Sequence, residues 1–217
     1  NKLNLIFKYK KDDLSLNDIV FSLNNLNFLS EKISLKKLNN DFLIDGKINH
    51  KKLDIEEKNL ALFIEPFLPK IDIEKLKFSS SNNFSLKVNK KFKLNEFKID
   101  SKVLIDDLSI SNKFNLDNFL PNIKQSLNFS DHEVSIKYIK DDLNINGKGN
   151  ILIQDKKDFL TYSINYENSD LNFITSLKID DNPLKIDFLN YEKNKNLIQK
   201  EGLKNRENEI FIKLFSI

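Results

Sequence analysis

The sequence has no cysteine and only two histidines, which limits the chemistry that the chain can carry. Without cysteine there is no disulfide, no thiolate nucleophile and no cysteine-based zinc site. Glycine and proline occur only four times each. Tight turns must therefore be formed mainly by aspartate and asparagine, which tolerate turn conformations and hydrogen-bond their own backbone.

Methionine is also absent, even at position 1, where the chain already alternates like a strand. We therefore expect residues 1–217 to form a single all-β segment, an internal fragment of a larger protein. No apolar run reaches the roughly 20 residues of a membrane-spanning helix. The 35 basic and 32 acidic residues are interleaved and leave a net charge of only +3. Without a basic block to follow a phosphate backbone, nucleic acid is not an expected partner.

Apolar and polar residues alternate along most of the chain, which is typical of strands with one apolar and one polar face. The clearest runs are 3–9, 84–88, 97–105, 134–138, 143–153, 160–166, 171–179, 184–188 and 210–214. Acid pairs at 12–13, 106–107, 141–142 and 180–181 predict turns, and Asp45-Gly46 predicts a hairpin. Residues 79–83 predict a loop. The predicted fold class is mainly β, a long twisted antiparallel β-meander.

Two segments depart from this alternation and predict short amphipathic helices. Their apolar residues fall at helical spacing: Leu60, Phe63, Ile64, Phe67 and Leu68 in the first, and Leu116, Phe119, Leu120, Ile123 and Leu127 in the second. Asn59 and Asn115 are suitable N-caps. Pro66 and Pro121 should shorten or kink the two helices. We expect both to lie across the apolar face or to cap one end of the sheet.

The sequence offers no set of residues with the spacing of a catalytic or metal site. His132-Glu133 is not a His-Glu-x-x-His zinc motif, and both His50 and His132 are predicted to be solvated surface residues. The adjacent aspartates lack the alternate spacing of a calcium loop. Gly147-Lys148-Gly149 lacks the helix of a nucleotide-binding loop and predicts a bulge or a close packing contact. Enzyme activity, a cofactor and a metal are therefore not expected.

The apolar face is the remaining feature, because a sheet of about ten strands exposes more apolar area than water tolerates. The face can become the core of a β-sandwich, close into a barrel, or curl into an open groove filled by acyl chains. Few long crossovers suit a continuous groove better than a Greek key. Periodicity alone does not choose among the three.

Several stretches resemble AsmA-like proteins of bacterial envelopes, in particular the YhdP and TamB relatives. The resemblance rests on residues 41–48, on Lys52-Leu53-Asp54-Ile55, on the expected helix at 59–68 and on the following train of strands. Residues 147–153 and 183–188 fit the same style. This family implies a taco-like β-groove that moves phospholipid between inner and outer membranes, on a periplasmic chain anchored in the inner membrane of a Gram-negative bacterium.

The resulting hypothesis is a non-enzymatic lipid conduit whose expected partners are phospholipid acyl chains and an inner-membrane anchor upstream. The expected groove-lining residues are Phe97, Ile99, Val103, Ile105, Val134, Ile136, Tyr138, Ile151, Ile153, Tyr162, Ile164, Phe173 and Leu177. The alternative is an adhesin-like β-sandwich interaction module with a dry core. A third possibility, a glycan-active enzyme, would need two convergent carboxylates in a cleft.

Overall fold

The computed structural model describes residues 3–23, 26–56, 72–112, 118, 120–167, 170–186, 190–193 and 209–215. Thirteen strands lie in these ranges. They are β1 (Leu3–Lys10), β2 (Asp13–Leu23), β3 (Leu26–Leu38), β4 (Asp41–Glu56), β5 (Ile73–Asn89), β6 (Leu94–Ser111), β7 (Ser126–Ile139), β8 (Asp142–Leu152), β9 (Lys157–Glu167), β10 (Asp170–Lys178), β11 (Leu184–Ile186), β12 (Tyr191–Lys193) and β13 (Glu209–Phe215).

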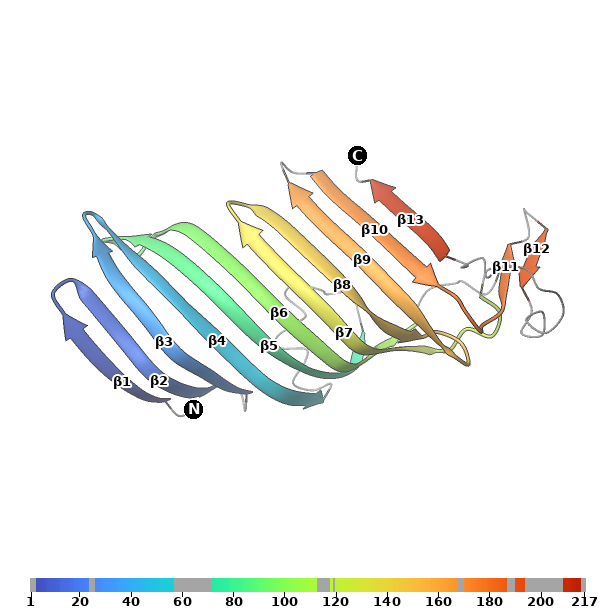
Figure 1. Ribbon diagram of the computed structural model, residues 1–217, viewed down its shortest axis with the longest axis horizontal. Helices are drawn as coiled ribbons and strands as arrows, with labels where there is room; N and C mark the ends of the chain where they lie inside the picture. The colour runs from blue at the N-terminus through green and yellow to red at the C-terminus, as the bar shows by residue number, and fades with distance from the viewer. Residues whose placement is uncertain are drawn as a thin grey trace.

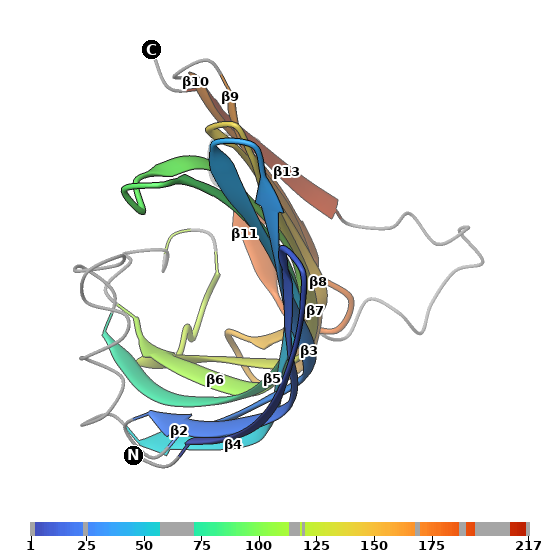
Figure 2. The same ribbon diagram turned by 90° about the vertical axis from the view of Figure 1, so that its left-hand side faces the viewer.

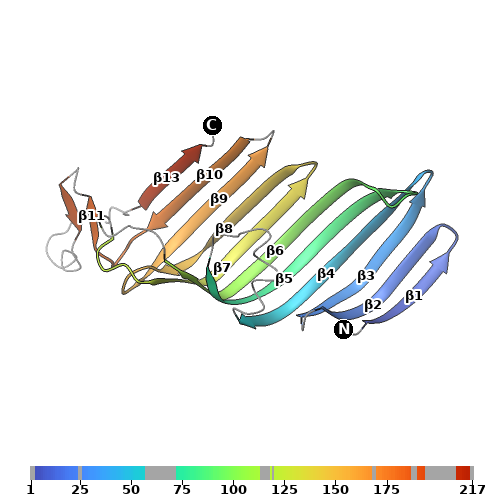
Figure 3. The same cartoon turned by 180° about the vertical axis from the view of Figure 1, so that it is seen from behind.

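Eleven strands form one antiparallel sheet in which β1 to β10 follow chain order and β13 pairs with β10. Figure 1 shows these strands side by side, with the small β11–β12 ribbon beyond one end. The same row is seen from behind in Figure 3. The predicted meander is confirmed. The described strands make one large layer rather than two stacked sheets of similar size.

Two of the predicted acid turns are the hairpin turns of this meander. Lys140 and Asp141 have φ values of 50° and 72° and connect β7 to β8. Asp12, with a φ of 62°, connects β1 to β2. Positive φ matches the right-handed twist of paired strands, and aspartate tolerates it better than most residues. The turn predicted at Asp180-Asp181 lies in the bends that follow β10.

Three other turn or loop predictions are wrong because those residues lie inside long strands. Asp45-Gly46 is in the middle of β4, and residues 79–83 are in the middle of β5. Asp106 is an extra residue within β6, where the register with β5 shifts by one. An acid pair can therefore lie within a paired strand where a bulge takes up the extra residue. A run of serine and asparagine can likewise pair as part of a strand.

The bulge at Asp106 belongs to a line of irregularities that crosses the sheet. The registers of β3–β4, β4–β5 and β7–β8 each shift by one residue. Asp18 in β2 and Asp131 in β7 have positive φ values of 50° and 57° at this line. Because a bulge bends its strand and increases its twist, aligned bulges curve a whole sheet. Figure 2 shows the strands curving around one side.

The closed hydrophobic core lies at one end of the sheet, where a connecting segment covers the apolar face. Its buried residues are Leu120, Leu127, Ile151, Ile153, Ile179 and Leu184. Leu120 belongs to the segment before β7, which lies inside the curve of the sheet in Figure 2. The apolar face is therefore the inner face, and its covered part is local.

The second predicted helix is wrong in its described part. Residues 120–125 form bends and turns, and Leu127 is already paired in β7. Pro121 and Asn122, whose φ is 61°, oppose a continuous helix there. The first predicted helix lies outside the described residues. Within the described ranges, no helix has the length and hydropathy of a membrane span.

Candidate functional site

The most extensive feature of the structure is an apolar row that runs across the first ten strands. Residues that are directly opposite in a sheet share a face, so the register defines this row. Its members, one per strand, are Phe7, Leu16, Ile33, Gly46, Phe84, Ile99, Tyr138, Leu143, Tyr166 and Leu171. With neighbouring strands about 4.8 Å apart, the row is roughly 43 Å long. All ten members except Gly46 are apolar or aromatic.

The predicted groove-lining residues of β6 to β10 share this inner face. Val103, Val134 and Tyr162 form one cross-strand row through Gly147. Ile136, Ile164 and Phe173 form the next row through Ile145. The remaining predicted residues of these strands are in phase with the two rows: Phe97, Ile99 and Ile105 in β6, Tyr138 in β7, Ile151 in β8 and Leu177 in β10.

Burial divides these predicted residues into two groups. Ile151, Ile153 and Leu177 pack in the closed core, with Ile153 just beyond the end of β8. Val134 is buried within the sheet surface. The others are half-buried: Phe97, Ile99, Val103, Ile105, Ile136, Tyr138, Tyr162, Ile164 and Phe173. A residue in a filled sandwich core is normally fully buried, so this second group lies where protein covers the face only partly.

Aromatic side chains lie close against three glycines of the inner face. A Cβ on Gly46 would lie 2.8 Å from the Phe84 ring, and a Cβ on Gly147 would overlap the Tyr162 ring. A Cβ on Gly149 would lie 2.6 Å from the Cα of His132. Since none of the glycines has a positive φ, they are required by close approach and not by backbone conformation. The close-packing alternative predicted for Gly147 and Gly149 is confirmed.

Both histidines are buried on the inner face, so the prediction that they are solvated surface residues is wrong. The His50 ring lies between those of Phe28 and Phe78 in tilted contacts, with ring centroids 5.4 and 5.2 Å away. Its Nδ1 is 2.8 Å from the Asn27 carbonyl oxygen, which only accepts, so Nδ1–H donates. His132 donates from Nε2 to the Asn150 carbonyl at 2.9 Å. Burial lowers the pKa of His132.

Buried amides join the covering segments to the end of the sheet. Gln154 donates from Nε2 to the carbonyl oxygens of Pro121 and Pro183, at 2.5 and 3.2 Å. Asn182 donates to the Lys156 carbonyl and to Oδ2 of Asp158, both at 2.7 Å. These bonds satisfy polar groups that would otherwise be costly to bury. They fix where the closed core ends.

The carboxyl of Asp158 is the most perturbed acid of this end. Burial raises its pKa to about 6, and the hydrogen bond from Asn182 only partly opposes that rise. The Asp180 carboxylate also raises the pKa, whereas the Lys193 ammonium lowers it. Asp158 lies beside the covered core and away from the hollow described next. Its raised pKa therefore reflects its burial at the covered end of the sheet.

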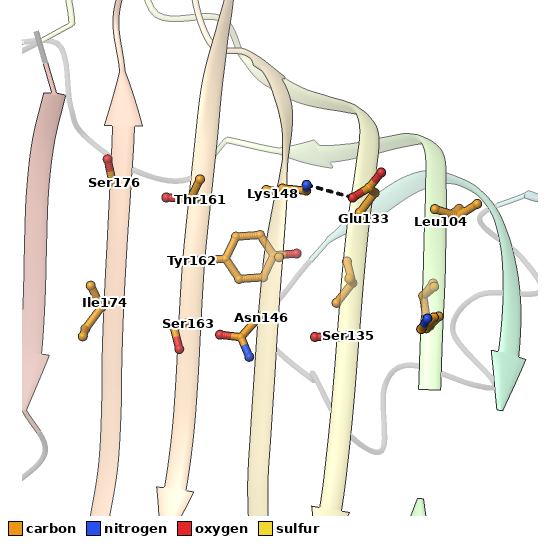
Figure 4. Close-up of a pocket in the computed structure, with 14 residues that line it drawn as sticks. Leu104, Glu133, Ser135, Asn146, Lys148, Thr161, Tyr162, Ser163, Ile174 and Ser176 are labelled. Carbon is orange, nitrogen blue, oxygen red and sulfur yellow. Dashed lines mark ion pairs between the residues drawn. The ribbon is translucent and has the colours of Figure 1, made fainter. Parts of the chain in front are cut away.

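A hollow of about 760 Å³ lies on the opposite, polar face. Figure 4 shows two rows of side chains on either side of Tyr162, and these rows alternate with the inner-face residues. One row contains Leu104, Glu133, Lys148, Thr161 and Ser176; the other contains Lys102, Ser135, Asn146, Ser163 and Ile174. Lys148 Nζ and Glu133 Oε2 are 3.1 Å apart. The sequence alternation that predicted the apolar face did not indicate this hollow. A pattern of apolar and polar residues does not distinguish small polar side chains from long ones.

Among the described residues, three charged side chains line the hollow: Lys102, Glu133 and Lys148. Glu133 is the only acid around the hollow, so a pair of convergent carboxylates is not found there. In the same ranges, histidines and acids do not gather in threes that could hold a metal ion. The described part of the sheet thus presents one apolar face and one polar face.

Comparisons with protein-family models, with curated proteins and with solved structures found no match to this chain. The resemblance to AsmA-like proteins therefore stays a prediction from the sequence.

Proposed function

We propose that this chain is a non-enzymatic lipid-binding segment that holds acyl chains along its inner face. The observation that carries the proposal is the apolar row across ten strands, none of whose ten members belongs to the closed core. Outside the closed core, the inner-face side chains of β6 to β10 are mostly half-buried. Covering them with hydrocarbon would contribute about 0.8 kcal/mol per buried CH₂ group.

The shape of the sheet favours an open groove over a dry sandwich core. The described strands form one layer, and bulges curve that layer toward its apolar side. In a groove of this kind, acyl chains lie against the floor while polar head groups stay in water at the rim. Movement along a row of similar apolar side chains needs no chemical step.

The wider setting proposed for this activity follows the AsmA-like resemblance. The chain would act in the periplasm of a Gram-negative bacterium, as part of a protein anchored in the inner membrane. Its partner would be phospholipid on its way between the inner and outer membranes. None of the ten described members of the apolar row has a charged side chain that would read a particular head group, so the bound lipids should be varied.

The first test is lipid extraction from the purified 217-residue chain, followed by mass spectrometry. We expect phospholipid to co-purify, and we expect Phe173→Asp to reduce its amount at least fivefold. The matched control is Ile174→Asp, since Ile174 is the next residue and belongs to the polar face. Equal lipid yields from the two variants, or no lipid on the parent chain, would refute the proposal.

A second test does not depend on how well an aspartate is tolerated. A photo-reactive amino acid at Ile164 should crosslink to a phospholipid acyl chain, whereas the same group at Ser163 should not. The two residues are adjacent in β9 and face opposite sides of the sheet. Equal crosslinking at Ser163 and Ile164 would mean that the lipid does not prefer the inner face, which would contradict the proposal.

A further inference from the structure

The hairpin that connects β5 to β6 ends in an ordered turn at residues 89–94, which we call the basic tip. Asn89 closes this turn, because its Oδ1 accepts hydrogen bonds from the backbone N–H groups of Lys91 and Lys93 at 2.9 and 3.0 Å. The Phe92 N–H also donates to the Asn89 carbonyl, and the Asn89 N–H donates to the Lys93 carbonyl. The side chains of the basic tip therefore project from a fixed backbone.

Phe92 is the most exposed large apolar residue of the described chain, with 76% of its surface accessible. Its φ is 58°, a conformation that is unfavourable for a residue with a bulky side chain. Its ring stacks on that of Phe42, with centroids 6.2 Å apart, and Phe42 is on the inner face in phase with Gly46. Figure 2 shows the green tip of this hairpin turned toward the inner side of the curve. The fold thus holds a strained aromatic residue in water at the rim of the inner face, which favours a role in binding.

The charges of the basic tip are all of one sign. Three exposed lysines flank Phe92 in the sequence: Lys90, Lys91 and Lys93. Residues 89–94 contain no acid, so these three lysines give them a net charge of +3. The two neighbouring acids, Asp41 and Glu96, each lie 3.6 Å from Lys87. Among the described residues, no carboxylate pairs with the three lysines of the tip.

We propose that the basic tip docks on a lipid bilayer that contains anionic phospholipid. The Phe92 ring lies at the boundary between head groups and acyl chains, and the lysines contact lipid phosphates. Segments that bind membrane surfaces combine aromatic or leucine side chains with lysines in this way. An anionic leaflet attracts each nearby lysine, and this attraction falls off within a Debye length.

Two more exposed apolar residues extend the surface that enters the bilayer. Leu94, opposite Val88 at the start of β6, is 52% exposed, and Leu38 at the β3–β4 tip is 45% exposed. The two tips are joined, because Asn95 Nδ2 donates to Asp41 Oδ1 at 3.3 Å. Lysines alone would suffice for a nucleic-acid backbone, whereas exposed apolar side chains beside them favour a bilayer.

The docking does not rest on acyl chains lying along the inner face, since it needs only the two tips. It adds a place for the membrane: the rim at which the inner face begins. Because the Phe92 ring contacts Phe42, apolar contact would be continuous from the bilayer to the inner face.

The first test uses the absence of tryptophan from the sequence. Phe92→Trp gives the chain a single tryptophan, whose emission should shift to the blue with vesicles that mix phosphatidylcholine and phosphatidylglycerol. Vesicles of phosphatidylcholine alone should give a much smaller shift, because they lack the negative surface charge. The control is Phe159→Trp, at a residue of the polar face of β9 that is 41% exposed, and its emission should not shift.

The second test measures affinity by co-sedimentation with the same anionic vesicles. Replacing the three lysines of the tip by glutamine should weaken binding at least about tenfold, since each lysine near an anionic surface contributes roughly fivefold. The matched control replaces three exposed lysines of the polar face by glutamine: Lys98, Lys102 and Lys137. Phe92→Asn should also weaken binding, and asparagine suits the positive φ, so the variant should fold.

A last comparison separates this docking from lipid binding by the inner face. Phe173→Asp should leave the blue shift of the Phe92→Trp chain unchanged, because it alters the inner face and not the tip. The absence of a blue shift with anionic vesicles, which a tip that binds a protein or a nucleic acid would give, would overturn the proposal. So would equal shifts with anionic and neutral vesicles, equal effects of the two lysine replacements, or unchanged vesicle binding by Phe92→Asn.

Discussion

Gly147 and Gly149 of the inner face differ in what a methyl group would meet, and this difference can be measured. At Gly149 the added Cβ would press on the backbone Cα of His132, which cannot move alone. At Gly147 it would press on the far end of the Tyr162 ring, which can rotate away. We expect Gly149→Ala to cost about 2–3 kcal/mol of unfolding free energy and Gly147→Ala about 1 kcal/mol. Urea unfolding followed by circular dichroism measures both.

A double-mutant cycle tests whether the contact with the Tyr162 ring causes the expected loss of stability in Gly147→Ala. Gly147→Ala should cost less in a Tyr162→Ala background, because the ring that it displaces is then absent. If Gly147→Ala costs the same in both backgrounds, the Tyr162 ring does not lie over the glycine as the structure has it. If Gly149→Ala is harmless, the close approach of β7 and β8 at His132 is incorrect.

Asp158 should make the chain less stable as the pH rises from 5 to 7. Its pKa is raised to about 6 in the folded chain from 3.8, so between these values the folded state binds a proton that the unfolded state has lost. Stability is therefore greatest below the unfolded pKa and is lost as the pH rises through 6. We expect a loss of about 1.5 kcal/mol, since a tenfold change in proton affinity is about 1.4 kcal/mol.

The control for this pH dependence is Asp158→Asn, which keeps an oxygen to accept the bond from Asn182. This variant should be more stable than the parent at pH 7 and should lose the slope between pH 5 and 7. Urea midpoints at several pH values measure it. A slope that persists unchanged in the Asp158→Asn variant would assign the effect to other groups.

The buried histidines show which residue-level features the sequence already contained. His132 is in phase with Val134, Ile136 and Tyr138, and His50 is in phase with Ile48. The phase of the alternation therefore carried a signal for burial, but the general exposure of histidine led to the prediction that both lie on the surface. The partners that make burial tolerable, the Asn27 and Asn150 carbonyls, lie on neighbouring strands and could not be read from the sequence.

Strand β7 offers a direct test of the bulges that curve the sheet. Asp131 has a φ of 57°, and its Oδ2 accepts a bond from Asn150 Nδ2 at 3.1 Å. A β-branched residue is strongly disfavoured at positive φ, so Asp131→Val should cost about 1–2 kcal/mol. Asp131→Asn keeps both the φ preference and an acceptor, so it should stay within about 0.5 kcal/mol of the parent. Chemical unfolding compares the two variants, and equal stabilities would mean that no bulge lies at Asp131.

The bulges also explain why some strands were predicted from the sequence and others were not. Strands β8 to β10 keep a strict period of two and match their predicted runs closely. In β2 the apolar phase changes at Asp18, from Leu14 and Leu16 to Ile19 and Phe21, so the alternation is interrupted. In β6 the same interruption at Asp106 looked like a turn. In the sequence, an extra residue within a paired strand interrupts the alternation in the same way as a true turn does.

For the sheet as a whole, alternation predicted one apolar face but not what covers it. Whether Leu120, Ile179 and Leu184 close over β8 to β10 depends on where two connecting segments go, and buried amides at 154 and 182 hydrogen-bond these segments to the end of the sheet. These amides were not singled out, because a glutamine or asparagine in a loop is usually solvated. The thirteen predicted groove residues therefore combine an open part of the face with three residues of a closed core.

Binding of an acyl chain along the open part should stabilise the entire chain. A ligand that binds only the folded state adds about 2.7 kcal/mol at a free concentration one hundred times its dissociation constant. For a sheet of this size, that corresponds to a rise in Tm of about 5–10 °C. We expect this rise with a lysophospholipid kept below its micelle concentration, measured by scanning calorimetry. Glycerophosphocholine, which has the head group without the acyl chain, should give no rise in Tm.

Phe173→Asp should reduce the rise in Tm and Ile174→Asp should leave it unchanged, because only the first variant removes an apolar side chain from the inner face. A rise with the head group alone, or an equal rise in both variants, would mean that the stabilising contact is not the inner face.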